Sequence, residues 1–210
     1  MQHAFGRWGL PSCLRVDNGK PWGSWSDLPP VLALWLIGLG IEMLWNPPRR
    51  PQHNGVVERS QGTAKRWAEP QTCTGVDELQ QRLSADDRLQ REKYPLIKGL
   101  SRWQLFPDLC HSRRPYRIAD ETDLWDLERV LTHLAGYAVT RRVDRTGQVS
   151  VYNRNYYVGV VHGGQTIYVM FDAQSREWLF TDRDGKQLRS KPAVEINAER
   201  IRTLDLTGKK

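Results

Sequence analysis

The chain has 210 residues, of which 39% are hydrophobic and 26% are charged, and its formal net charge is +7. This composition supports a core in one or two folded domains. Three cysteines without metal-like spacing argue against a disulfide framework or a zinc site and for a reducing cytoplasm. The longest uncharged apolar run, Leu28 to Ile41, is too short to span a bilayer, and no targeting segment is recognised at the N-terminus.

The positive charge is concentrated in the first half of the sequence. Residues 1–119 contain 17 Lys and Arg against 11 Asp and Glu, an excess of six, whereas residues 120–210 contain 14 against 13, an excess of one. A basic excess of this kind fits a nucleic-acid partner, although a solvated surface also produces it.

The first elements of the chain have the pattern of an α/β unit. Residues 1–10 read as a short helix, and 13–16 as a strand that ends at the turn Asp17-Asn18-Gly19. An apolar helix is expected over 31–39 and a second strand over 41–45. Because sites in open α/β sheets form outside the carboxyl ends of strands, Asp17 is well placed for chemistry.

A proline-rich loop then leads into a helix. Prolines within 46–59 keep the chain out of the helical region, and Asn54 is a plausible N-cap for a helix that starts near Val56. Glu58 then falls in the first turn, where the helix dipole favours an ionised carboxylate. Lys65 lies two turns further along on the same side. Such a carboxylate suits a metal ligand beside a phosphate backbone, and a favourable dipole partner is the alternative.

The second half combines helices with short strands. An amphipathic helix is expected over 76–93, a basic and proline-containing linker over 94–119, and a short helix over 123–134. A period of two then begins, with turn signals between the apolar runs, and it predicts a small β-barrel or sandwich of five or six strands. The runs are 137–140, 149–152, 156–160, 166–171 and 177–180.

These elements together carry a family resemblance. A strand ending in Asp17-Asn18-Gly19, a helix, a strand, a proline loop and then Gln52-His53-Asn54-Gly55 before Glu58-Arg59 resemble integrase-type transposases of bacterial insertion sequences. These enzymes are relatives of retroviral integrases and have a ribonuclease H-like catalytic domain. The resemblance covers about the first half of the chain closely, and the strands of the second half resemble the small barrel that follows this domain in many of these enzymes.

The resemblance implies a metal-dependent site. Asp17 matches the second catalytic carboxylate of the family and Glu58 the third. In the intact enzyme, which holds two Mg²⁺ or Mn²⁺ ions, Asp17 would bind one ion and Glu58 the other. Lys65 matches a position that contacts the DNA end. No residue is assigned to the first catalytic aspartate, and the first three strands of the family fold are expected to be absent. We therefore expect weak metal binding and no useful strand transfer from these residues alone.

Further residues are candidate contacts to the phosphates of DNA, with solvated surface charge as the alternative. They come from the proline loop, the following helix and the first strand of the second half. The candidates are Arg49, Arg50, Gln52, His53, Asn54, Arg59, Arg66, Arg141 and Arg142.

The expected fold is therefore α/β plus a small all-β domain. Residues 1–93 would form the C-terminal portion of an integrase catalytic core with a partial ribonuclease H-like fold, 94–119 a linker, and 120–205 a small Src-homology-like β-barrel that binds DNA. We expect a stable core from about residue 120 onward and weaker protection of 1–119. The expected partners are double-stranded DNA and, in the intact enzyme, further copies of the chain, with no membrane partner and a cytoplasmic, nucleoid-associated location.

Two functions remain open from the sequence. The first is part of a transposase that acts in DNA integration and transposition by phosphoryl transfer. The second is a non-catalytic DNA-binding protein that occupies transposon ends or inhibits an intact transposase.

Overall fold

The computed structural model describes residues 1–23, 27–49, 55–110 and 114–205, and the chain divides into two compact units. The helical unit comprises Met1–Gly9 and Arg49–Pro115, and the sheet unit comprises Leu10–Pro48 and the chain from Tyr116 onward. Residues 10–48 thus group with the C-terminal sheet rather than with 49–93. The compact units do not follow the boundaries expected after 93 and 119, and the functional division into core, linker and DNA-binding domain stays a prediction.

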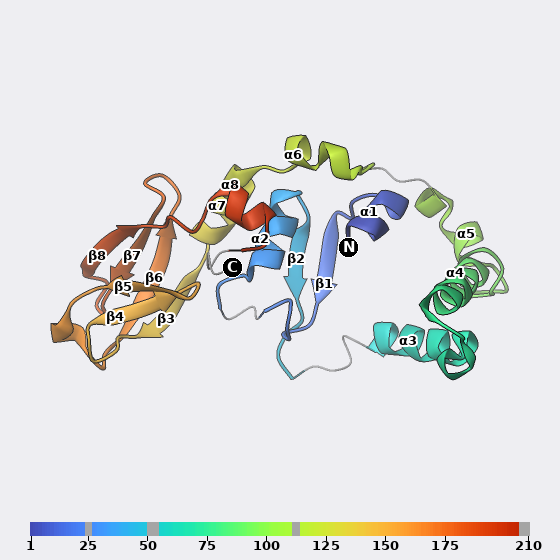
Figure 1. The fold of residues 1–210 in the computed structure, drawn as a ribbon, viewed down its shortest axis with the longest axis horizontal. Helices are drawn as coiled ribbons and strands as arrows, with labels where there is room; N and C mark the ends of the chain where they lie inside the picture. The colour runs from blue at the N-terminus through green and yellow to red at the C-terminus, as the bar shows by residue number, and fades with distance from the viewer. Residues whose placement is uncertain (24–26, 50–54, 111–113, 206–210) are drawn as a thin grey trace. The chain divides into compact units, whose positions relative to one another are not determined.

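The sheet unit begins with two parallel strands joined by a buried helix. Strand β1 (Cys13–Val16) pairs with β2 (Glu42–Trp45) from Cys13↔Glu42 to Val16↔Trp45, and α2 (Val31–Gly38) connects them. Figure 1 shows the two arrows side by side with α2 next to them. Because α2 is apolar all round, it is buried on nearly every side, and Ala33 and Leu34 have no exposed surface. These elements confirm the expected strand, helix and second strand.

Two short helices stand where one was expected over 123–134. They are α6 (Glu121–Leu124) and α7 (Leu127–Ala135). The break has a local cause, because Trp125 is extended and Asp126 starts a new helix by accepting a hydrogen bond from the Glu128 amide at 2.9 Å.

The remaining strands form one sheet and one hairpin. The sheet is antiparallel with the order β3-β6-β7-β8, and β4 pairs with β5 in a separate two-stranded sheet. Among the described strands there is no closed barrel, so the confirmed fold class is mixed α/β with several sheets. The bounds are β3 Ala138–Arg142, β4 Gln148–Val151, β5 Arg154–Tyr157, β6 Thr166–Asp172, β7 Glu177–Thr181 and β8 Gln187–Pro192. Strand β8 lies outside the five apolar runs that the sequence predicted as strands.

The hairpin packs on the sheet through aromatic side chains. Trp178 and Phe180 of β7 are fully buried, and their rings lie 6.1 Å from Tyr152 and 5.7 Å from Tyr156, respectively, centre to centre. Helix α8 (Ala198–Arg202) follows the sheet, and the unit also contains two short 3-10 turns, η4 (Ile118–Asp120) and η5 (Val160–His162).

The helical unit has little buried surface. It contains α1 (Gln2–Trp8), α3 (Gly55–Ala68), α4 (Val76–Glu92) and α5 (Arg102–Leu105), with turns η2 (Pro70–Thr72) and η3 (Pro107–Cys110). Helix α4 confirms the helix expected over 76–93, whereas α5, η3 and η4 lie in the segment expected to be a linker. Of the described apolar side chains in this unit, only those of Phe5 and Ala68 are buried.

Candidate active-site segments

Asp17 lies at the carboxyl end of the parallel strand pair. It directly follows β1, and its side chain is exposed. Its Oδ1 atom accepts a hydrogen bond from the Gly19 amide at 3.3 Å, which is the geometry of an Asx turn. The carboxyl end of the strand pair therefore presents an accessible carboxylate, in the turn that the sequence predicted.

The loop that follows Asp17 is tied to the end of β2. The Asn18 side-chain amide donates to the Asn46 carbonyl at 2.5 Å, and the Trp45 indole N–H donates to the Trp22 carbonyl at 2.9 Å. Because both bonds cross to the residues that end or follow the neighbouring strand, they fix the turn against that strand. Trp22 is half-buried, which fits packing within this loop.

Glu58 lies in the first turn of α3, as expected, and its side chain is exposed. Lys65 is seven residues further along, hence on the same face and about 10 Å along the helix axis. Both side chains point to solvent, and Arg59 and Arg66 are exposed on the same helix. The N-cap expected at Asn54 lies outside the described residues.

The two carboxylates belong to different compact units, Asp17 to the sheet unit and Glu58 to the helical unit. Within the described parts of the chain, no group of three or more His, Cys, Asp or Glu side chains is placed to hold a metal ion. Mg²⁺ is usually bound by one or two carboxylates that retain several waters and phosphate oxygens. Asp17 and Glu58 each supply one exposed carboxylate of such a donor set. Either carboxylate alone is an incomplete metal site.

The expected DNA contacts fall into three groups. Arg49 and the α3 cations are exposed, and Arg50, Gln52, His53 and Asn54 lie outside the described residues. Arg142 is exposed on β3, but Arg141 forms an ion pair with Asp27, with Nη2 2.5 Å from Oδ1. A phosphate at Arg141 would therefore compete with a carboxylate 114 positions earlier in the chain. No sequence pattern pointed to that pairing, since the two residues share no local element.

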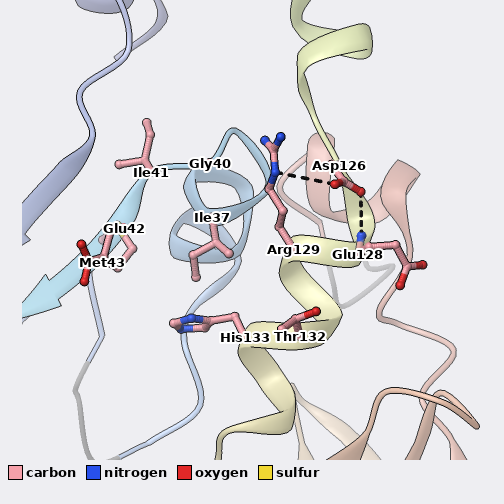
Figure 2. Close-up of a pocket in the computed structure, with 10 residues that line it drawn as sticks. All are labelled: Ile37, Gly40, Ile41, Glu42, Met43, Asp126, Glu128, Arg129, Thr132 and His133. Atoms are coloured by element: carbon pink, nitrogen blue, oxygen red, sulfur yellow. Dashed lines mark hydrogen bonds and ion pairs between the residues drawn. The ribbon is translucent and has the colours of Figure 1, made fainter. Parts of the chain in front are cut away.

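A groove of about 510 Å³ opens elsewhere in the sheet unit. It lies between the C-terminal end of α2, the start of β2 and helix α7, and its apolar wall is formed by Ile37, Ile41 and Met43. Figure 2 shows the side chains of Arg129 and His133 extending from α7 toward this wall. Since Ile41 to Met43 are at the amino end of β2, the groove lies at the opposite end of the strand pair from Asp17.

The polar groups of this groove hold the fold together. Arg129 donates to the Gly38 carbonyl at 3.1 Å. Its Nε lies 3.6 Å from Asp126, and Figure 2 draws this ion pair as a dashed line. Burial lowers the pKa of His133, which therefore favours the neutral ring, and its Nε2 is 3.3 Å from the Tyr137 hydroxyl. Among the described residues, none of those expected to act in catalysis or DNA binding lines this groove.

No protein-family model matches this chain. Across the described ranges, no helix has both the length and the apolar composition that crossing a membrane requires. The resemblance to integrase-type transposases therefore stays an expectation that rests on the sequence motif alone.

Proposed function

We propose that this chain acts in DNA transposition as part of an integrase-type transposase, with Asp17 and Glu58 as two of its metal-binding carboxylates. The observation that carries the proposal is the order of the elements: a carboxylate directly after the first of two parallel strands, and a second one in the first turn of the helix that follows them. The finer assignment, a partial ribonuclease H-like core followed by a relative of the Src-homology-like barrel, belongs to the same proposal.

In this proposal the chain supplies ligands and positioning groups. When bound, Mg²⁺ or Mn²⁺ would polarise the scissile phosphate and activate the attacking hydroxyl. Asp17 and Glu58 would each hold one ion, Glu58 from the positive N-terminal end of the α3 dipole. Lys65, on the same face of α3, would contact a phosphate at the DNA end. The expected partners are double-stranded DNA and further copies of the chain.

A non-catalytic DNA-binding protein is the second candidate. It is favoured by the donor set, because in the described ranges no group of three or more His, Cys, Asp or Glu side chains is placed to hold a metal ion. Such a protein would occupy transposon ends or inhibit an intact enzyme without cutting DNA.

DNA binding with and without a divalent metal separates the two candidates. The protein is titrated onto a labelled duplex in EDTA, Mg²⁺ or Mn²⁺, and strand transfer is followed on the same DNA. For the transposase we expect metal to strengthen binding, with the gain lost in both Asp17→Asn and Glu58→Gln. We expect no strand transfer from these residues alone, since two carboxylates do not complete the site.

The control is Asp87→Asn, which removes an exposed carboxylate from α4 and should behave as the wild type. If the affinity for duplex DNA is the same with and without metal, and is unchanged in Asp17→Asn and Glu58→Gln, the second candidate is supported. A protein that does not bind duplex DNA at all excludes both. Metal-dependent strand transfer that disappears in Asp17→Asn would establish the enzyme and overturn the expected inactivity.

A further inference from the structure

The outer edge of the β3-β6-β7-β8 sheet carries a group of exposed positive charges. Strand β8 is its last strand, as Figure 1 shows, and pairs only with β7 among the described strands. Four exposed cations lie on β8 or on the turn that leads into it: Arg183, Lys186, Arg189 and Lys191. Two carboxylates accompany them in the same stretch, Asp182 and Asp184, which leaves an excess of two positive charges.

Other arginines of this unit are neutralised within the protein. Arg117 pairs with Asp120 at 2.7 Å, and Arg176 pairs with Glu128 at 2.8 Å. No ion pair between described residues involves the four cations of the β8 edge. The Asp182 carboxylate is used by the turn itself, because its Oδ1 accepts hydrogen bonds from the amides of Asp184 and Lys186. The four cations are therefore available to an external anion.

The register of β8 sets the spacing of these charges. Arg189 stands opposite Phe180 and Lys191 opposite Trp178, so both cations lie on the face that carries the buried aromatic core. Their stems can cover the margin of this core while the charged groups reach water. Alternate residues of a strand are about 7 Å apart, and each strand of B-DNA carries one phosphate per about 3.4 Å of helix axis, so phosphates are dense enough to meet both cations. The unpaired side of an edge strand also offers backbone N–H donors.

We propose that the β8 edge, defined by Arg183, Lys186, Arg189 and Lys191, is a contact surface for the phosphate backbone of double-stranded DNA. The inference rests on the proposed function for its choice of DNA, and it adds a binding surface in the second half of the chain that does not depend on Asp17 or Glu58. Its contacts are to phosphates, so it positions the protein and carries no sequence preference of its own.

The salt dependence of DNA binding tests the proposal. The dissociation constant for a labelled duplex is measured over a series of salt concentrations for the wild type and for Arg189→Gln/Lys191→Gln. The logarithm of the association constant falls linearly with the logarithm of the salt concentration. Each lost phosphate contact makes this slope shallower by about one, so we expect a slope that is shallower by about two. Arg183→Gln/Lys186→Gln, which changes only the exposed turn, should show the same effect without touching the sheet.

Arg117→Gln/Arg176→Gln is the matched control. It removes the same formal charge from the same unit, but from arginines that already have carboxylate partners, and its slope should equal that of the wild type. Circular dichroism and thermal melting establish that each variant is folded.

The outcomes separate this inference from the proposed function. Wild-type binding with an unchanged slope in both edge variants overturns the inference and leaves the proposed function standing. A wild type without salt-dependent DNA binding refutes the proposed function itself. Charges on an edge strand can also serve to prevent aggregation; edge variants that aggregate but keep the wild-type slope identify that role instead. Preferential binding of RNA or of anionic vesicles, lost in the edge variants, assigns the surface to a different polyanion.

Discussion

At the scale of single residues, buried glutamates hold the sheet unit together. Glu195 has no exposed surface and accepts hydrogen bonds from the Trp178 indole at 2.8 Å and from the Tyr156 hydroxyl at 2.5 Å. Glu121 is placed in the same way, between the Trp35 indole and the hydroxyl of Tyr116. Burial, together with the bond to Glu195, raises the pKa of the Tyr156 phenol, which therefore remains a donor far into the alkaline range.

Removal of the Glu195 carboxylate should destabilise this unit strongly. Glu195→Ala leaves two buried donors without an acceptor and opens a cavity, and we expect a loss on the order of 3 kcal/mol in the free energy of unfolding. The loss can be measured by urea unfolding followed through tryptophan fluorescence. Glu199→Ala, an exposed glutamate in α8, is the control and should change stability by about 0.5 kcal/mol or less. Equal losses in the two variants would contradict the assigned role.

A close approach at Gly38 provides a second residue-scale prediction. A Cβ atom at this position would lie 2.1 Å from the Trp125 indole nitrogen, which donates to the Trp35 carbonyl at 3.0 Å. Gly38→Ala should therefore displace Trp125, break this bond and cost about 1–3 kcal/mol by overpacking. Thermal unfolding measures the cost.

Gly62→Ala is the control for this substitution. Gly62 lies inside α3, and its added Cβ would meet no atom within 4 Å. Since alanine favours a helix over glycine, this variant should be neutral or stabilised by about 0.5–1 kcal/mol. Comparable destabilisation of both variants would mean that the contact with Trp125 is not the cause.

At the scale of elements, helix α4 shows how a local contact starts a helix. Glu78 in its first turn accepts hydrogen bonds from the amide and the hydroxyl of Thr74 at 2.8 and 2.7 Å, and from Arg82 at 2.5 Å. These hydrogen bonds lower the pKa of Glu78 to about 2. The backbone bond from Thr74 contributes most, followed by the two side-chain bonds.

This shift makes the N-terminal end of α4 sensitive to acid. The stabilisation is present above the unfolded-state pKa of about 4.5 and is lost as the pH falls from there through about 2, because the protonated carboxyl no longer binds its donors. Helicity at 222 nm should decline over this window, and the decline should be smaller in Glu78→Gln. Asp87→Asn, on the exposed side of the same helix, should follow the wild type. An identical decline in Glu78→Gln would assign the acid sensitivity to other groups.

Elements with a strong local pattern were predictable from the sequence. The apolar run at 31–39 gave α2, the alternation near 166–171 gave β6, and the amphipathic period at 76–93 gave α4. Strand β8 has no comparable pattern, because between Gln187 and Pro192 its one large aliphatic side chain is Leu188, among polar and charged residues at a sheet edge. An edge strand is held by pairing on one side, and this pairing is a tertiary contact.

At the scale of the whole molecule, the two units differ in how much they bury. The sheet unit contains nearly all of the described core, including α2 and the aromatic cluster around Trp178. The helical unit instead exposes large apolar side chains over a short stretch, with Tyr94, Ile97 and Phe106 each about half exposed. Local opening is therefore easier in the helical unit.

Limited proteolysis should follow the units rather than the midpoint of the chain. We expect the first cuts within 55–110, while residues 10–48 stay associated with the fragment from 116 onward, because α2 is held by Trp35–Glu121 and Trp125–Trp35 bonds. Mass spectrometry after gel filtration identifies the pieces that remain together, and the same separation in urea is the control. Rapid degradation of 10–48 together with 55–110 would instead support the stable core from about residue 120 that the sequence suggested.

The sequence by itself determined the local features: the strand before Asp17, the helix that places Glu58 in its first turn, and the period-two strands of the second half. These follow from turn chemistry and hydrophobic periodicity, which act over a few residues. Only the tertiary structure decided that residues 10–48 belong with the C-terminal sheet and that Arg141 meets Asp27. Those contacts join residues about a hundred positions apart, and their energy depends on the complete packing, so no short stretch of sequence records them.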